Sequence, residues 1–199
     1  MSLLLALPAA VGLALLAAPL IATLFWHGEF TRHDVIMTRH ALVAYAAGLT
    51  GIILVKILAP GFYAKQDIRT PVKVAIVTLA VTQLFNLAFV PWLRHAGLAL
   101  AISLGACFNA GWLWLHMRRS GAFRPEPEWG AFLLKLAVAL YLMGGVIWFG
   151  MGTESSWFEI PAATRAIRLS AVIAGAMLAY FASLRMMGMR LRDFVRHEP

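Results

Sequence analysis

The sequence predicts an all-α fold, a polytopic transmembrane helical bundle of six helices. Its first basis is six apolar runs, each about 20 residues long, which is the length of helix that crosses a hydrocarbon core of about 30 Å. Its second basis is composition, because 61% of the 199 residues are hydrophobic and only 13% are charged, about half the charge of a soluble domain. A backbone in lipid must satisfy its own hydrogen bonds, so the runs must be helices. They cover residues 3–26, 41–62, 72–92, 97–117, 130–152 and 166–187.

The basic residues predict the orientation of this bundle. The chain carries a net charge of +8 at pH 7. If all six runs span, ten Lys and Arg lie on one side and five on the other, so the positive-inside rule places both termini in the cytoplasm. Topology accounts for the basic charge, and we expect no nucleic acid partner. The more basic side holds Lys65, Arg69, Lys73, Arg118, Arg119, Arg124, Arg185, Arg190, Arg192 and Arg196, and the other side holds Arg32, Arg39, Arg94, Arg165 and Arg168.

The first run and the loop after it contain prolines and histidines. The run lacks the basic start and cleavage site of a signal peptide, so we expect a retained helix that Pro19 bends. Residues 27–39 form a polar segment, which we interpret as a wet interfacial loop. Its histidines do not repeat at the four-residue spacing of a helical metal site, and the sequence assigns no metal. They are His27, His33 and His40.

The second run combines small residues with one buried charge. Its small residues lie four apart, which indicates either close helix packing or chance in a chain rich in alanine and glycine. Pro60-Gly61 is expected to end the helix. Lys56 lies about 10 Å of helix before Tyr63. A lysine at that depth marks a functional site by default, and the alternative is a side chain that reaches back to the interface. The small pairs are Ala44/Gly48 and Ala47/Gly51.

The third and fourth runs carry a polar stripe and its expected partner. Thr78, Thr82 and Asn86 repeat every four residues and share one helical face, with Gln83 beside them. The stripe indicates hydrogen bonds between helices, and the alternatives are the lining of a transport cavity or part of an ion site. Ser103 on the fourth run is expected to pair with this stripe, because the loop between the two runs is short.

The remaining segments indicate no chemistry. Glu126 and Glu128 are flanked by prolines, which predicts an extended connector rather than an acid–base pair. The fifth and sixth runs are almost wholly apolar, and a lipid-binding surface and a peripheral scaffold both stay open. Lys135 lies near the start of the fifth run, within reach of the interface. No phosphate-binding loop, HExxH or GxSxG pattern occurs, and the single Cys107 excludes an internal disulfide. We therefore predict a protein that is not an enzyme and needs no cofactor.

One stretch resembles a known family. Residues 56–73 read Lys-Ile-Leu-Ala-Pro-Gly-Phe-Tyr-Ala-Lys-Gln-Asp-Ile-Arg-Thr-Pro-Val-Lys, followed by Asn-Leu-Ala-Phe at 86–89 and His-Ala-Gly-Leu at 95–98. This closely resembles the MurJ (MviN) family of lipid II flippases, within the multidrug/oligosaccharidyl-lipid/polysaccharide exporter superfamily. Its members have fourteen helices in two lobes, and this chain resembles the last six. The resemblance implies four helices of the second lobe in 1–117, a cytoplasmic connector in 118–129, a C-terminal helix pair in 130–187 and a basic cytoplasmic tail in 188–199.

The resemblance also implies a function. The intact protein would translocate undecaprenyl-linked peptidoglycan precursor across the bacterial inner membrane by alternating access, with lipid II, membrane lipids and the missing N-terminal helices, or a chain supplying them, as partners. The alternatives are a flippase for another polyprenyl-linked oligosaccharide, or a non-transporting fragment or assembly partner. Thr82 and Asn86 lie where some relatives place sodium ligands, although the stripe has no acidic residue. Lys56 matches a family lysine that faces the central cavity. The candidate substrate-binding or cavity-lining residues are Lys56, Thr78, Thr82, Gln83, Asn86 and Ser103.

Overall fold

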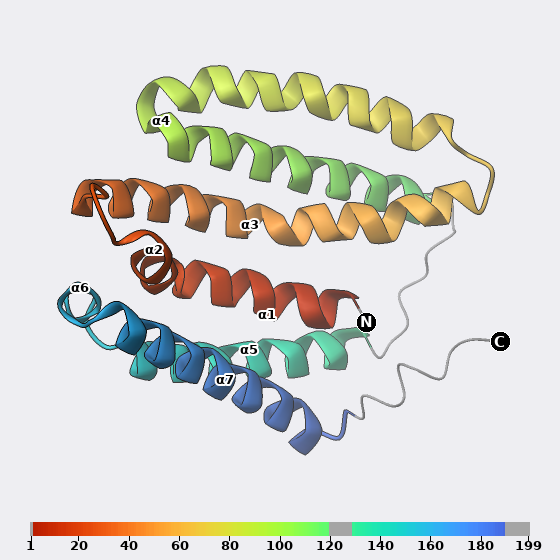
Figure 1. Ribbon diagram of the computed structural model, residues 1–199. Coiled ribbons are helices and arrows are strands. Elements are labelled where there is room, and N and C mark those ends of the chain that lie inside the picture. Colours follow the sequence, from red (N-terminus) through yellow and green to blue (C-terminus); the bar gives the residue numbers. More distant parts are fainter. Residues whose placement is uncertain (1, 120–128, 190–199) are drawn as a thin grey trace. The chain divides into compact units, whose positions relative to one another are not determined.

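The computed structural model describes residues 2–119 and 129–189, and its regular structure there is entirely α-helical (Figure 1). This confirms the predicted all-α fold. The helices fall into two compact units. The central unit consists of α3 (Arg32–Tyr63) and α4 (Arg69–Arg119). The terminal unit consists of α1 (Ser2–Leu15), α2 (Ala17–Phe25), α5 (Trp129–Met151), α6 (Ser156–Glu159) and α7 (Ala162–Met186).

Among the described residues, four helices are long and apolar enough to cross a membrane, namely α3, α4, α5 and α7. The pair α1 and α2 makes a fifth candidate if it counts as one broken span, because the two helices are bent by 68° at a short break. This confirms the bend expected in the first run. Pro19 lies in the first turn of α2, where it has no N–H to continue the hydrogen bonds of α1.

Helix α4 is two helical segments joined by a sharp turn. It contains 51 residues, and one straight helix of that length would measure about 75 Å. A bilayer core is only about 30 Å thick. At Arg94 the backbone has φ 48° and ψ −122°. The chain reverses there, so the segments 69–93 and 95–119 lie side by side (Figure 1). We call them the first and second arms of α4.

Two expectations about α3 were wrong. The helix begins at Arg32, so the second half of the predicted loop 27–39 is helical. His33 lies in this part, and His40 follows it in the same helix. Hydropathy detects only the part of a helix that lies in lipid, and polar turns beyond it leave no such signal. Helix α3 also continues through Pro60 to Tyr63. A proline removes one hydrogen bond from a helix, which a transmembrane helix tolerates when its surroundings compensate.

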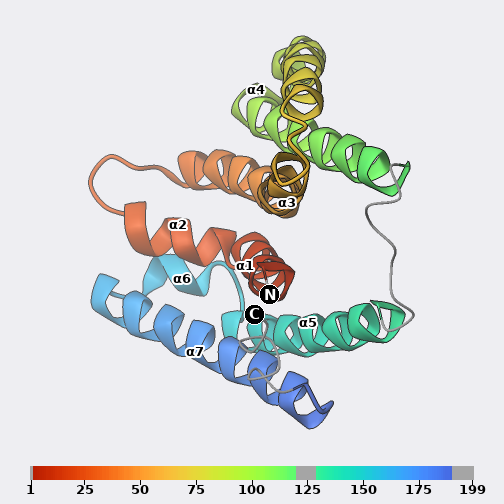
Figure 2. The same ribbon diagram turned by 90° about the vertical axis from the view of Figure 1, so that its right-hand side faces the viewer.

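In the terminal unit, α5 packs along α7, and α2 contacts both α7 and α6 (Figure 2). The core between them is aliphatic and holds the buried side chains of Leu136, Ala139, Met143, Ile147, Val172 and Ala176. One end of this unit is fastened by Arg168. Its Nη2 donates to the carbonyl of Met151 at 2.9 Å, and its Nη1 donates to Ser156 Oγ at 3.1 Å. The guanidinium also lies 4.6 Å from the centre of the Trp157 ring, so one cation caps the end of α5 and holds α6.

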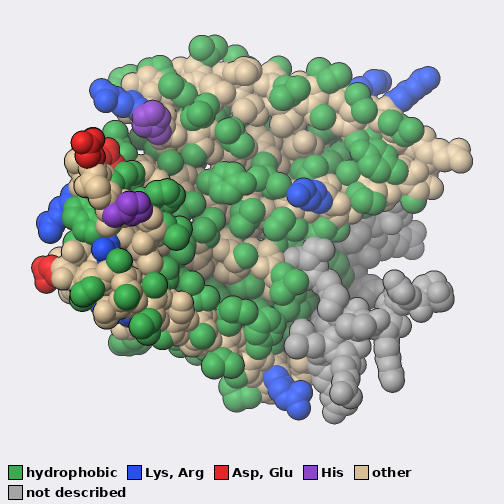
Figure 3. Space-filling model, viewed as in Figure 1, with side chains coloured by type: hydrophobic (Ala, Val, Ile, Leu, Met, Phe, Trp, Pro, Cys, Tyr) green, Lys and Arg blue, Asp and Glu red, His purple; other side chains and the backbone are tan. Residues whose placement is uncertain are grey.

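Hydrophobic side chains are spread widely over the face shown in Figure 3, between tan atoms of the backbone and other side chains. Large exposed examples occur in both units, such as Leu87 at 75% and Phe149 at 87% exposure. A soluble protein rarely leaves such continuous apolar surface in water, so the surface agrees with lipid contact. Much of the predicted connector and tail, including Glu126 and Glu128, lies outside the described residues.

The turn in α4 generates a stability prediction. The φ and ψ of Arg94 are typical of glycine at the first central position of a type II′ turn, and a side chain there costs about 1–3 kcal/mol. We expect Arg94→Gly to raise the free energy of unfolding in detergent by about 1 kcal/mol. Arg94→Ala keeps the Cβ atom and should give no gain. Equal stabilisation by both substitutions would contradict a backbone origin of the strain.

Candidate functional site

All six predicted site residues lie in the central unit. Lys56 is on α3, Ser103 is on the second arm of α4, and the other four are on the first arm. The structure therefore brings them into one three-segment bundle. The contacts of each side chain show whether it holds the helices together or remains available to bind a ligand.

Glycines set how closely these segments approach. A Cβ added at Gly48 would overlap Ser103, and one added at Gly51 would lie 2.8 Å from the backbone nitrogen of Cys107. Helix α3 and the second arm are thus in near-backbone contact and run parallel. This contact settles the interpretation of the small residues at these two positions in favour of close packing.

Ser103 holds α3 to the second arm. Its side chain is 2% exposed, and its Oγ donates to the carbonyl of Ala44 at 2.7 Å. The expected pairing of Ser103 with the polar stripe was therefore wrong. Since the carbonyl of Ala44 has a second lone pair, it accepts this bond in addition to its helical one. The role of Ser103 is interhelical, and its hydroxyl is already used.

The polar stripe lies mainly between the two arms of α4. A Cβ at Gly105 would overlap Thr82 Oγ1, and one at Gly97 would meet the carbonyl of Phe89. Because the arms are antiparallel, this register places Asn109 level with Thr78. Thr78 donates its hydroxyl to the carbonyl of Val74 at 2.8 Å, within its own helix. The two threonines are therefore explained by packing and local hydrogen bonding.

The amides of this region are less completely bonded. Asn86 Nδ2 donates to Gln83 Oε1 at 3.2 Å, so the two predicted residues form a pair at the edge of the stripe. The Oδ1 atoms of Asn86 and Asn109 are buried and accept no hydrogen bond from the described residues. Asn109 was not among the predicted site residues, because it breaks the four-residue spacing of the stripe and lies on the other arm. Such oxygens can accept a water, a donor from a ligand or a cation.

Lys56 differs from the other candidates because it carries a charge, and it is exposed on an apolar helix. It forms no hydrogen bond or ion pair with any residue in the described part of the chain. Four residues later, Pro60 has no N–H to donate to the carbonyl of Lys56. A charged amine and a backbone carbonyl lacking its usual donor thus occur at one residue. The amine suits an anionic group, and the carbonyl suits a hydrogen-bond donor such as water or a hydroxyl.

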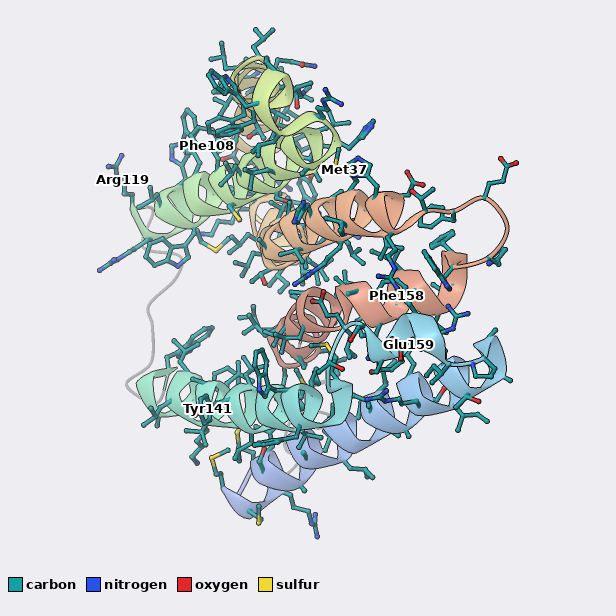
Figure 4. All side chains as sticks on the ribbon, turned by 90° about the vertical axis from the view of Figure 1, so that its left-hand side faces the viewer. Met37, Phe108, Arg119, Tyr141, Phe158 and Glu159 are labelled. Carbon is teal, nitrogen blue, oxygen red and sulfur yellow. The ribbon has the colours of Figure 1, made fainter. Side chains whose placement is uncertain are left out.

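The end of the central unit beyond Lys56 is basic. Lys65, Arg69 and Lys73 surround the turn between α3 and α4, and Asp67 Oδ1 accepts a hydrogen bond from the backbone N–H of Thr70 at 3.0 Å. Hydrogen bonding by the side chain and backbone of Thr70 lowers the pKa of Asp67, so this carboxylate is charged at neutral pH and caps α4. Arg119 lies at the same end, on the side of α4 that carries Phe108 (Figure 4).

The described residues contain no cluster of three or more His, Cys, Asp or Glu side chains that could hold a metal ion. Within the stripe, only amide and hydroxyl oxygens are present. These are weaker cation ligands than carboxylates. Of the two hydroxyls, that of Thr78 is used in a hydrogen bond and that of Thr82 packs against Gly105.

The terminal unit contains a separate, almost wholly apolar pocket of about 300 Å³. Its walls come from α1, α2, α5 and α7, and it opens to the outside. A pocket with this lining suits a hydrocarbon chain rather than a polar headgroup. Its wall includes Leu5, Pro8, Gly12, Met143, Met177 and Tyr180.

The glycine contacts generate a second prediction. We expect Gly48→Val to destabilise the protein by about 1–3 kcal/mol, because the added methyl groups would push Ser103 and the second arm away. Gly111, on the second arm of α4, is the matched control, since a Cβ there meets nothing within 4 Å. Thermal unfolding in detergent measures both variants. If Gly111→Val were as destabilising as Gly48→Val, general helix effects rather than close packing would explain the loss.

Comparison with known proteins gives consistent matches. A family model described as "Lipid II flippase MurJ" matches residues 1–166. The lipid II flippase MurJ of Burkholderia cenocepacia is 44% identical over 194 residues, which cover 97% of this chain and 38% of that protein. The probable lipid II flippase MurJ of Vibrio cholerae is 34% identical over 189 residues, covering 95% of this chain and 36% of that protein.

A solved structure, "Lipid II flippase MurJ, inward closed conformation", has the same fold. It superposes with a TM-score of 0.76 at 23% identity and covers 98% of this chain and 38% of the solved chain. This chain therefore spans less than two fifths of the length of the proteins it matches.

Proposed function

This chain belongs to the MurJ family of lipid II flippases, a family of transporters and not of enzymes, and from that membership we propose that it is the C-terminal part of such a flippase. The intact protein would move undecaprenyl-linked peptidoglycan precursor from the cytoplasmic to the outer leaflet of the bacterial inner membrane by alternating access. Six spans and cytoplasmic termini belong to this proposal. The bent pair α1–α2, helix α3, the two arms of α4, α5 and α7 would supply the six spans.

The observation that carries the proposal is Lys56. A lysine in the apolar part of a transmembrane helix costs about 3 kcal/mol unless it meets water, a partner or a cavity. No described residue pairs with it. The pyrophosphate of a lipid-linked precursor is an anion of opposite charge, and a cavity between two lobes would bring it alongside Lys56. Asn86 and Gln83 would line the same cavity, whereas Thr78, Thr82 and Ser103 would shape it from behind through the packing described above.

The different side-chain chemistry of the two units also supports the proposal. The headgroup of such a lipid is polar and its tail is a long hydrocarbon. The central unit offers a charge and amides, and the terminal unit offers an apolar pocket. A flippase must accommodate both parts of the lipid, and the tail can stay in the bilayer while the headgroup crosses.

The activity of this chain by itself depends on the part of its relatives that it does not span. It spans 38% of its Burkholderia relative, so half of a two-lobed cavity must come from elsewhere. We propose that preceding helices, or a separate chain that supplies them, complete the cavity. A non-transporting fragment is the second candidate, and the same short coverage favours it.

Substitution of Lys56 tests the proposal. In the context of a full-length protein, we expect Lys56→Gln to reduce lipid II flipping by about tenfold or more, the loss of one charge-assisted contact. Lys56→Arg should retain most activity, because it keeps the charge. Lys135→Gln on α5 is the matched control and should leave flipping unchanged. The assay is growth of cells depleted of their own flippase, with membrane insertion checked for each variant. Normal growth with Lys56→Gln would remove the headgroup role of this residue.

A further inference from the structure

We propose that Tyr45 is a second contact for the polar headgroup, on the same face of α3 as Lys56 and nearer the N-terminal end of that helix. This inference rests on the proposed function, because it names a further residue along the path that the headgroup would take. It follows from how the exposed surface of α3 is divided between polar and apolar side chains.

One side of α3 is packed against its own unit. A Cβ added at Gly48 would overlap Ser103 on the second arm of α4. Leu58 and Phe62 continue this side toward the end of the helix and are 9% and 7% exposed. Beyond this packed side, α3 exposes two further rows of large side chains, one apolar and one polar.

The apolar row follows a seven-residue spacing along α3. Ile36, Val43 and Ile57 are 49%, 38% and 41% exposed, and this spacing keeps them on one side of the helix. Thr50 is the one polar side chain among the four positions of the row, and a threonine hydroxyl can bond to the carbonyl of the preceding turn. Lipid can therefore cover this side of α3.

The polar row contains Lys56 and both tyrosines of α3. Tyr45 lies eleven residues before Lys56 and Tyr63 seven residues after it, and both intervals return to the same side of an α-helix within about 20°. Tyr45 is 40% exposed and Tyr63 is 52% exposed, and Lys56 is exposed as well. The polar row lies about 140° around the helix from the apolar row.

This division bears on what the tyrosines face. Tyrosines often anchor a transmembrane helix at the two membrane interfaces, and Tyr45 and Tyr63 are about 27 Å apart along the helix. A lipid anchor belongs on the side that faces lipid, which is the side of the apolar row. Both tyrosines instead lie on the side of Lys56, whose charge must meet water or a ligand. The tyrosines therefore border the same polar path as the lysine.

The polar row offers the groups that an anionic, hydroxyl-rich headgroup needs. The amine of Lys56 attracts phosphate, and its carbonyl can accept from a sugar hydroxyl because Pro60 supplies no donor. The hydroxyl of Tyr45 can donate to a phosphate or sugar oxygen, and it forms no hydrogen bond within the described part of the chain.

The two contacts act at successive positions. Tyr45 and Lys56 are about 16 Å apart along the helix axis. With cytoplasmic termini, α3 runs from the outer to the inner side of the membrane. Lys56 would therefore hold the headgroup in the inner half of its path, and Tyr45 would receive it in the outer half.

Thiol labelling of a full-length protein tests which side of α3 meets water. With Cys107→Ser as background, single cysteines are introduced as Tyr45→Cys and Lys56→Cys in the polar row, and as Val43→Cys and Ile57→Cys in the apolar row. A charged, water-soluble maleimide should label the two polar-row cysteines. The apolar-row cysteines should react only after the protein is dissolved in SDS, because a thiol in apolar surroundings does not ionise readily. Equal labelling of Tyr45→Cys and Val43→Cys would overturn the polar path.

Transport tests the contact itself. We expect Tyr45→Phe to slow the arrival of lipid II in the outer leaflet about fivefold, the loss of one hydrogen bond. The assay follows the accessibility of lipid II to an enzyme added outside the cells. Tyr45→Trp keeps an interfacial anchor but should also be slow, because the indole N–H cannot take the position of the phenol hydroxyl. Tyr141→Phe on α5, where the side chain is 82% exposed, is the control and should transport normally.

The outcomes separate this contact from the proposed function. Normal transport by Tyr45→Phe, with Lys56→Gln impaired, would overturn the contact at Tyr45 and leave the proposed function standing. Normal transport by Lys56→Gln would remove the path along α3 together with the headgroup role of the lysine. Full activity of Tyr45→Trp would reduce Tyr45 to a lipid anchor and would also overturn the contact.

Discussion

The structure depends on one constraint, that backbone hydrogen-bonding groups in lipid must find partners inside the protein. Prolines break this rule locally, and the helices of this chain contain several. Pro8 releases the carbonyl of Leu4, which accepts from Tyr180. Pro19 lies beside the break between α1 and α2. Pro60 leaves the carbonyl of Lys56 without its usual donor, at a residue whose charge pairs with no other described residue. The places where the helical pattern fails are therefore the hydrogen bond between Tyr180 and Leu4, the bend between α1 and α2 and the candidate headgroup site.

The two units solve the packing problem in opposite ways. In the central unit, Gly48, Gly51 and Gly105 remove side chains where helices meet, and the segments approach until backbone and hydroxyl groups touch. Tight packing of this kind suits a rigid wall for a polar cavity. In the terminal unit, Leu4, Leu7 and Val11 of α1 pack into an apolar core, and an apolar pocket lies along the same helix.

Sequence reasoning predicted the all-α fold, the presence of apolar helices long enough to cross a membrane, the bend in the first run and the family. These depend on composition and on local rules for proline, which one sequence contains. It missed that α3 begins at Arg32, because polar helical turns outside lipid look like loop. It also assigned Ser103 to the wrong partner, because the spacing of polar residues along one helix does not reveal which neighbour it faces. The buried, unbonded oxygen of Asn109 and the hydrogen bond between Tyr180 and Leu4 could not be predicted for the same reason. Both depend on helix register and on contacts between residues distant in sequence.

The central claim is that this chain supplies one part of a flippase cavity and needs the rest. The most direct measurement is rescue of cells depleted of their lipid II flippase by this chain, alone or together with the helices that precede the matching region in the Burkholderia relative. The account predicts growth only when both are expressed. Growth with this chain alone would contradict it, because six spans would then form a complete path. Failure of both, with membrane insertion of each piece confirmed, would contradict it in favour of a fragment that does not transport.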